Sequence, residues 1–218
     1  QKLIGKKLEV LEQKIQLNHK TDQTLVQMAQ ALFKSWFVDF DPVIDNALAA
    51  SNPIPDELKD RTQRRQQQLA KPDHKPLPEH IRQLFPSEFE LIEELGWVPK
   101  GWGRKKVIEL VGVTDYVANG SFAALKENVK LYDEPEYALY IRTTDYKNGF
   151  STEKAKYVDK PSYDFLKKTC LDGSEIIISN VGDVGTVFTP PDWLGKPMTL
   201  GSNAIAIRAG NLKYYLFQ

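Results

Sequence analysis

The sequence has few of the residues that build disulfides, metal centres or membrane spans. Its 218 residues include one cysteine, Cys170, and three histidines. A single cysteine excludes an internal disulfide and fits a reducing compartment such as the cytoplasm. His74 and His80 have no third ligand nearby, so we expect no metal site. A signal peptide and a run of about 18 apolar residues are both missing, which predicts a soluble protein without a membrane partner.

An excess of charge of either sign is also missing. Lys plus Arg and Asp plus Glu both total 29, so the net charge is zero. A global basic signature for nucleic-acid binding is therefore absent, and any DNA contact must come from local patches. The hydrophobic content of 41% is sufficient for one large domain or two small ones.

Catalytic motifs are scarce. Residues 189–193 superficially resemble the Asn/Asp-Pro-Pro-aromatic loop of amino-methyltransferases, but Thr189 stands at the amide or carboxylate position and Asp192 at the aromatic one. The sequence has neither a P-loop nor a glycine-rich cofactor loop after a strand. We therefore expect no catalytic residues and no cofactor in this chain.

Residues 2–40 carry a heptad repeat, which predicts one long helix whose seam binds a partner helix. A stripe this narrow stabilises an isolated helix too little to keep it ordered. Polar residues at two seam positions would fix the register of the pair. In the alternative, the helix packs on its own domain and these two residues reach solvent. The seam positions recur in steps of three and four: Leu8, Leu11, Ile15, Asn18, Asp22, Leu25, Ala29, Leu32 and Trp36.

The seam is long enough to act as a spacer. From Leu8 to Trp36 it spans roughly 42 Å at 1.5 Å per residue, a length suited to modules that meet DNA about one helical turn apart. Pro42 disfavours helix at Asp41 and is predicted to end the long helix. Residues 45–95 form a connector with a short helix at 56–70. We expect its Arg61, Arg64 and Arg65 on a solvated face, with phosphate contact as the alternative.

The part from Trp102 onward alternates short β-rich runs with turn residues. The runs predict strands at 107–111, 137–142, 155–158, 175–179, 185–189 and 203–208, with a helix at 162–169. Irregular spacing with one helix between strands predicts an α+β domain on a curved, mostly antiparallel sheet. Residues 212–218 are expected to begin another helix. The predicted domains are thus a spacer coiled-coil helix at 1–42, a connector at 43–95 and the α+β domain at 96–218.

Residues 141–150 form the first candidate DNA-contacting segment, a strand that runs into a polar loop. Arg142 has the geometry for a bidentate contact to guanine, Thr143 and Thr144 suit bases or phosphates, and Lys147 suits a phosphate. In the structural alternative, Arg142 forms an ion pair with Asp145 and the loop is only a turn.

The second candidate segment is the hairpin around Gly182 and Gly185, which free the backbone for close approach to a strand or a phosphate. A structural hairpin is the alternative to a phosphate clamp. Asn180 beside it offers a donor and an acceptor for adenine. Lys196 and Asn203 lie on loops that we expect nearby, and they complete the candidate DNA-binding set.

Four segments carry a family resemblance. They are residues 14–18 with 28–43, residues 84–102 with their Pro-x-Gly-Trp turn, the Ile-Arg-x-x-Asp strand exit at 141–145 and the hairpin at 171–188, and they resemble the specificity subunit of type I restriction-modification enzymes. Ser174 and Glu175 depart from that family's Leu-x-x-Gly-Asp pattern. In that family the Pro-x-Gly-Trp turn leads into the target-recognition domain, so we expect Trp97 and Trp102 to pack on the domain that follows.

The resemblance implies a non-catalytic subunit with one spacer helix and most of one DNA target-recognition domain. Two such domains would each read half of a bipartite site in double-stranded DNA. Antiparallel spacer helices would set their separation and dock modification (methyltransferase) subunits that use S-adenosylmethionine, while restriction subunits would hydrolyse ATP and cut DNA.

Two other classes stay open: the specificity region of a fused adenine methyltransferase polypeptide, and a coiled-coil adaptor with a protein-binding β domain. Gln1 at the start and the apolar segment 212–218 at the end predict that the sequence is the middle of a longer polypeptide.

Overall fold

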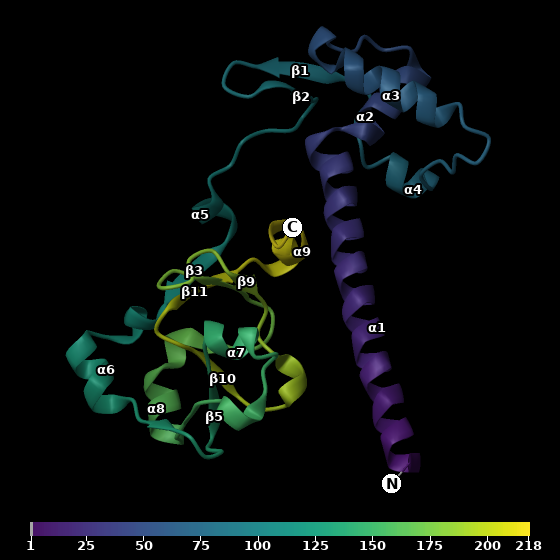
Figure 1. Cartoon of the computed structure of the whole chain (residues 1–218). Coiled ribbons are helices and arrows are strands. Elements are labelled where there is room, and N and C mark those ends of the chain that lie inside the picture. Colours follow the sequence, from purple (N-terminus) through teal and green to yellow (C-terminus); the bar gives the residue numbers. More distant parts are fainter. Residues whose placement is uncertain (1) are drawn as a thin grey trace. The chain divides into compact units, whose positions relative to one another are not determined.

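The chain divides into two compact units in the computed structural model, which describes residues 2–218 and, from residue 5 on, their side chains. The first unit ends at Arg104, and the second spans Lys105–Phe217. The first is helical apart from one hairpin, whereas the second is built on strands (Figure 1). The predicted α+β fold is confirmed.

The long helix of the first unit is present as predicted. Helix α1 (Lys2–Phe33) continues into a π-helical turn, η1 (Lys34–Val38). Phe40 then takes a left-handed conformation with φ of 57°, and Pro42 lies in the first turn of α2 (Asp41–Ala50). The prediction that Pro42 ends the long helix is therefore wrong. Pro42 begins the next helix, because the N–H that it lacks has no helical partner in a first turn.

The connector contains the predicted short helix and a hairpin. Arg64 is exposed as expected. Arg61 and Arg65 are half-buried, contrary to expectation: Arg61 Nε donates to Asp41 at 2.6 Å, and Arg65 Nε donates to Asp45 at 2.9 Å. Both acids belong to α2, so these ion pairs attach α2 to the short helix that carries the arginines. The elements are η2 (Asp56–Leu58), α3 (Lys59–Leu69), α4 (Glu79–Arg82), β1 (Phe89–Ile92) and β2 (Gly96–Pro99).

Aromatic side chains hold the exit of the long helix to the rest of the first unit. The Trp102 ring stacks on Phe37 with centroids 5.9 Å apart and meets Phe40 edge-on at 5.8 Å. Trp36 meets Phe85 edge-on at 5.5 Å. The aromatic partners of Trp102 thus lie upstream of it, in the first unit, and packing on the domain that follows stays a prediction. The predicted turn is present, since Trp102 N–H donates to Pro99 O at 3.0 Å.

The strands of the second unit form two sheets where the sequence predicts one. Their orders are β4-β6-β5-β10-β7 and β3-β11-β8-β9, and the pairing is antiparallel except between β5 and β10. The strands are β3 (Gly112–Asp115), β4 (Leu131–Tyr132), β5 (Ala138–Ile141), β6 (Tyr157–Val158), β7 (Cys170–Leu171), β8 (Ile176–Ser179), β9 (Val187–Phe188), β10 (Met198–Leu200) and β11 (Ala204–Arg208).

Short helices connect these strands. The prediction of a strand at 107–111 is wrong, because these residues form a helix while Gly112–Asp115 supplies the strand that pairs with β11. The predicted helices at 162–169 and 212–218 are confirmed in outline. The helices are α5 (Val107–Leu110), η3 (Tyr116–Asn119), α6 (Phe122–Asn128), α7 (Thr143–Lys147), η4 (Thr152–Lys154), α8 (Lys160–Phe165), η5 (Lys167–Thr169), η6 (Asp192–Leu194), η7 (Gly210–Leu212) and α9 (Lys213–Leu216).

One apolar core joins the two sheets. Leu139, Ile141 and Leu200 come from the five-stranded sheet, and Ile177 and Phe188 come from the four-stranded one. All five side chains are at most 3% exposed. This shared core fixes the ends of strands from both sheets relative to one another.

Candidate nucleic-acid interface

The topology brings three loops of the second unit to one place. Because β5 and β10 are parallel, their carboxyl ends, at Arg142 and Gly201, lie at the same edge of the sheet. Because β8 and β11 are antiparallel, the end of β8 lies beside the start of β11, and Asn180 N–H donates to Asn203 O at 3.1 Å. Gly201 N–H donates to Ile141 O at 2.7 Å, which continues the pairing of β5 and β10 within the five-stranded sheet.

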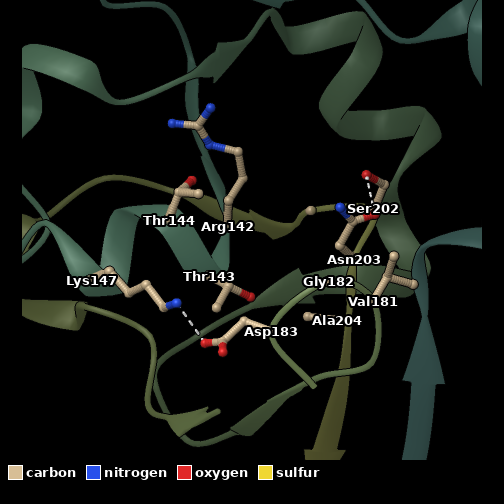
Figure 2. A pocket seen from close by; sticks show the side chains of 11 residues that line it. Arg142, Thr143, Thr144, Lys147, Val181, Gly182, Asp183, Ser202, Asn203 and Ala204 are labelled. Atoms are coloured by element: carbon tan, nitrogen blue, oxygen red, sulfur yellow. Dashed lines mark hydrogen bonds and ion pairs between the residues drawn. The ribbon is translucent and has the colours of Figure 1, made fainter. Parts of the chain in front are cut away.

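These loops enclose a cleft of about 360 Å³, hereafter the strand-end cleft. The predicted DNA-contacting segments, which are far apart in the sequence, meet in it (Figure 2). The sequence does not mark Gly201, Ser202, Val181 and Asp183 as contact residues, and their only signal is their place in turns beside the predicted strands. The lining residues are Arg142, Thr143, Thr144, Lys147, Val181, Gly182, Asp183, Gly201, Ser202, Asn203 and Ala204.

Helix α7 positions Lys147 on one wall of the cleft. Lys147 Nζ lies 2.7 Å from Asp183 on the opposite loop, and both side chains are about half exposed. Figure 2 shows the two charged groups pointing toward each other. The hydrogen bond from Lys147 and, after it, the bond from Thr186 hold the pKa of the Asp183 carboxyl below its ordinary value. Lys147 is therefore already paired with an acid.

Arg142 adopts the arrangement of the structural alternative. Its guanidinium donates from Nε to Asp145 Oδ2 at 3.0 Å and from a terminal nitrogen to Lys154 O at 2.8 Å. The hydrogen bond with Asp145 raises the pKa of Arg142 above its ordinary value. In Figure 2 the guanidinium points away from Lys147 and Asp183. A base contact by Arg142 would thus require it to leave a formed ion pair.

Polar groups without a charge complete the strand-end cleft. Thr144, Ser202 and Asn203 line it, and Ser202 Oγ donates to Asn203 Oδ1 at 3.3 Å. Thr143 Oγ1 is buried and has no hydrogen-bond partner among the described side chains. Hydroxyls, an amide and a lysine are the groups that proteins use to contact phosphate oxygens and base edges.

Two predicted contact residues lie outside the lining of the cleft. Asn180 is exposed directly beside it, at the end of β8. Lys196 lies before β10, near the opposite end of that strand. Its ammonium donates to Glu136 O at 3.2 Å and lies 5.7 Å from the centroid of the Tyr157 ring. The structure thus separates Lys196 from the other candidates.

The predicted helix seam is largely open. Leu8, Leu11, Ile15, Leu25 and Leu32 have exposed fractions between 49% and 57%. The two polar seam positions, Asn18 and Asp22, are exposed as well, and Ala29 is half-buried. Trp36 differs from them, because it packs on Phe85 within the first unit.

Taken together, these features define a class: an α+β module with a polar strand-end cleft, joined to a long helix with an uncovered apolar stripe. Among residues 2–218, no three His, Cys, Asp or Glu side chains are grouped to hold a metal ion. No helix in the same range is long and apolar enough to cross a membrane.

Comparison with known proteins agrees with the resemblance predicted from the sequence. The chain is similar to a protein of Haemophilus influenzae (strain ATCC 51907 / DSM 11121 / KW20 / Rd) described as the type I restriction enzyme HindI specificity subunit. The two are 29% identical over 199 residues, which cover 81% of this chain and 40% of the relative. The chain thus spans less than half the length of that protein. No family model and no solved structure matches the chain.

Proposed function

We propose that this chain is part of a DNA sequence-recognition subunit of a type I restriction-modification complex. The observation that carries the proposal is the similarity to the HindI specificity subunit over 81% of the chain. Neither compact unit makes up more than about half of the chain, so the similarity extends into both. In this proposal the domains are a spacer helix at 1–42, a connector at 43–95 and a target-recognition domain at 96–218.

The strand-end cleft is the proposed contact surface for one half of a bipartite site in double-stranded DNA. Lys147 and Thr144 suit the phosphate backbone, while Asn203 and Asn180 have amides suited to adenine. The net charge of the chain is zero, so in this role DNA contacts must come from local groups. The cleft gathers Lys147 and the polar side chains around it in one place.

Helix α1 is the proposed attachment point for other subunits. Its exposed leucines favour pairing with a second spacer helix, from the same or another chain, in a coiled coil that also docks the modification subunits. Methylation of DNA and ATP-dependent cleavage would then belong to the modification and restriction subunits of a cytoplasmic complex. This chain would contribute recognition without catalysis.

The test is selection of DNA from a randomised duplex pool by the chain assembled with its modification subunit, across a salt series. We expect enrichment of a short motif and affinity that falls steeply as salt rises. Lys147→Ala should weaken binding, whereas Lys126→Ala on the exposed face of α6 is the matched control. An assembled complex that enriches no motif would contradict the proposal, and capture of a helical partner without DNA binding would favour a coiled-coil adaptor.

A further inference from the structure

The loop between β8 and β9 presents apolar side chains at the mouth of a polar cleft. Val184 is 73% exposed at the tip of this loop, and Val181, which lines the cleft, is 56% exposed. Neither valine belongs to the core clusters of the second unit. Scattered exposed valines are ordinary, but these two flank Gly182 and Asp183 within one loop, hereafter the valine loop (181–185).

The valine loop is held in one conformation by its own hydrogen bonds. Gly185 N–H donates to Ser179 O at 2.9 Å, and Ser179 N–H donates to Thr186 O at 2.9 Å. Gly182 and Gly185 supply the positive φ angles, 79° and 90°, that this turn requires. Thr186 Oγ1, directly after the loop, donates to the Asp183 carboxylate. A loop fixed before binding loses little conformational freedom when it contacts a ligand.

The charge of the loop is balanced in a way that permits contact with DNA. Asp183 is its only ionisable side chain, and an isolated carboxylate there would repel phosphates. Lys147 pairs with that carboxylate at 2.7 Å, so the negative charge faces a cation on α7. The loop therefore offers apolar groups to a ligand without an unpaired acid beside them.

The dimensions of the hairpin select the groove. Two paired strands lie about 4.8 Å apart, and a two-stranded ribbon fits the major groove, which is about 12 Å wide, better than the minor groove, which is about 6 Å wide. Apolar side chains in the major groove recognise the thymine methyl group. Valine is also shorter than most of the side chains that proteins insert between base pairs to kink DNA.

We propose that the valine loop enters the major groove and that Val184 determines specificity by contacting the methyl group of a thymine. This inference rests on the proposed function and goes beyond it, because it names one residue and one base atom. Val181 would lie on the cleft side of the contact, and the polar cleft residues would hold the adjacent phosphate and base edges.

The test combines a protein change with a DNA change in the assembled complex. Each thymine of the selected motif is replaced singly by deoxyuridine, which lacks only the methyl group. At one position the unmodified protein should lose about four-fold in affinity, the value for removing one buried methyl group. Val184→Ala should lower affinity for the thymine duplex by a similar factor and should not distinguish thymine from deoxyuridine there, because the two changes remove the same contact.

Val113→Ala is the matched control, since Val113 is 47% exposed on β3, at the opposite edge of the same sheet from β9. It should leave affinity for both duplexes unchanged. The inference is overturned if every deoxyuridine is tolerated, if the motif contains no A·T pair, or if Val184→Ala weakens both duplexes equally. In each of these cases an enriched motif would leave the proposed function standing, whereas enrichment of no motif would overturn both.

Discussion

Replacing Arg142 should destabilise the second unit before it affects DNA recognition. Asp145 is only 7% exposed at its side chain, and its carboxylate accepts two hydrogen bonds from the Arg142 guanidinium and one from the Arg142 backbone N–H. Of these three hydrogen bonds, Arg142→Met would keep only the one from the backbone N–H. The buried Asp145 carboxylate would lose both bonds from the guanidinium. The substitution keeps much of the side-chain length, so the charge and the fork of donors are the principal loss.

The expected cost follows from the burial of the pair. Breaking a fully buried ion pair costs about 3–5 kcal/mol. Arg142 is 29% exposed, so water reaches one side of the pair, and we expect a loss of about 2–3 kcal/mol in the free energy of unfolding. For a unit of this size that corresponds to a fall of about 8–12 °C in the melting temperature. Arg142→Lys, which keeps the charge but not the bidentate geometry, should lose about half as much.

Thermal unfolding followed by circular dichroism, with DNA titration of the same variants below their melting temperatures, separates the two roles of Arg142. A structural arginine predicts a large fall in melting temperature and near-normal affinity in the remaining folded protein. A melting temperature within about 2 °C of the unmodified protein, together with loss of DNA binding, would refute this reasoning. It would mean that Arg142 leaves Asp145 to contact DNA.

Four further changes test the cleft and its support. Lys147→Ala should reduce the salt dependence of DNA binding by about 0.9 in the log–log slope, and Asp183→Asn should raise affinity about three-fold by releasing Lys147; fluorescence anisotropy measures both. Burial raises the pKa of Glu175, so the folded unit keeps that proton to a higher pH than the unfolded chain. Denaturant titrations should therefore show stability falling as pH rises from about 4.5, and Glu175→Gln should remove this trend. Gly201→Ala places a Cβ 2.7 Å from Ile141 O and should cost about 1–3 kcal/mol in calorimetry.

The elements that the sequence predicts well are those set by local pattern. Helix α1 is rich in helix-forming residues and contains no proline, while β8 is an isoleucine run and β11 alternates alanine with isoleucine, each bounded by turn residues. The strand predicted at 107–111 is wrong although the segment, like β8, is mostly apolar and contains β-branched residues. Its Val107 and Ile108 are 57% and 69% exposed, so no sheet covers them, and composition alone does not show which apolar runs find a partner strand.

The strand-end cleft depends on pairing that no local pattern encodes. Strand β10 has three residues between Pro197 and Gly201, too few to show an alternation, yet its parallel pairing with β5 brings Gly201 beside Arg142. The sequence identified Thr143, Thr144, Lys147 and Asn203 as side chains suited to DNA. It did not show that they meet in one cleft, nor that Lys147 is paired with an acid from another loop.

The heptad seam illustrates how backbone geometry changes the meaning of a sequence pattern. The repeat continues through Trp36, but residues 34–38 form a π-helical turn, which holds one more residue per turn than is needed to keep the heptad phase. Trp36 packs on Phe85 and is half-buried, whereas Leu8 and Leu32 are exposed. The face left open for a partner runs from Leu8 to Leu32, roughly 36 Å at 1.5 Å per residue. If the helix sets the distance between two DNA-reading domains, that shorter length, with an aromatic anchor at its end, is the spacing it encodes.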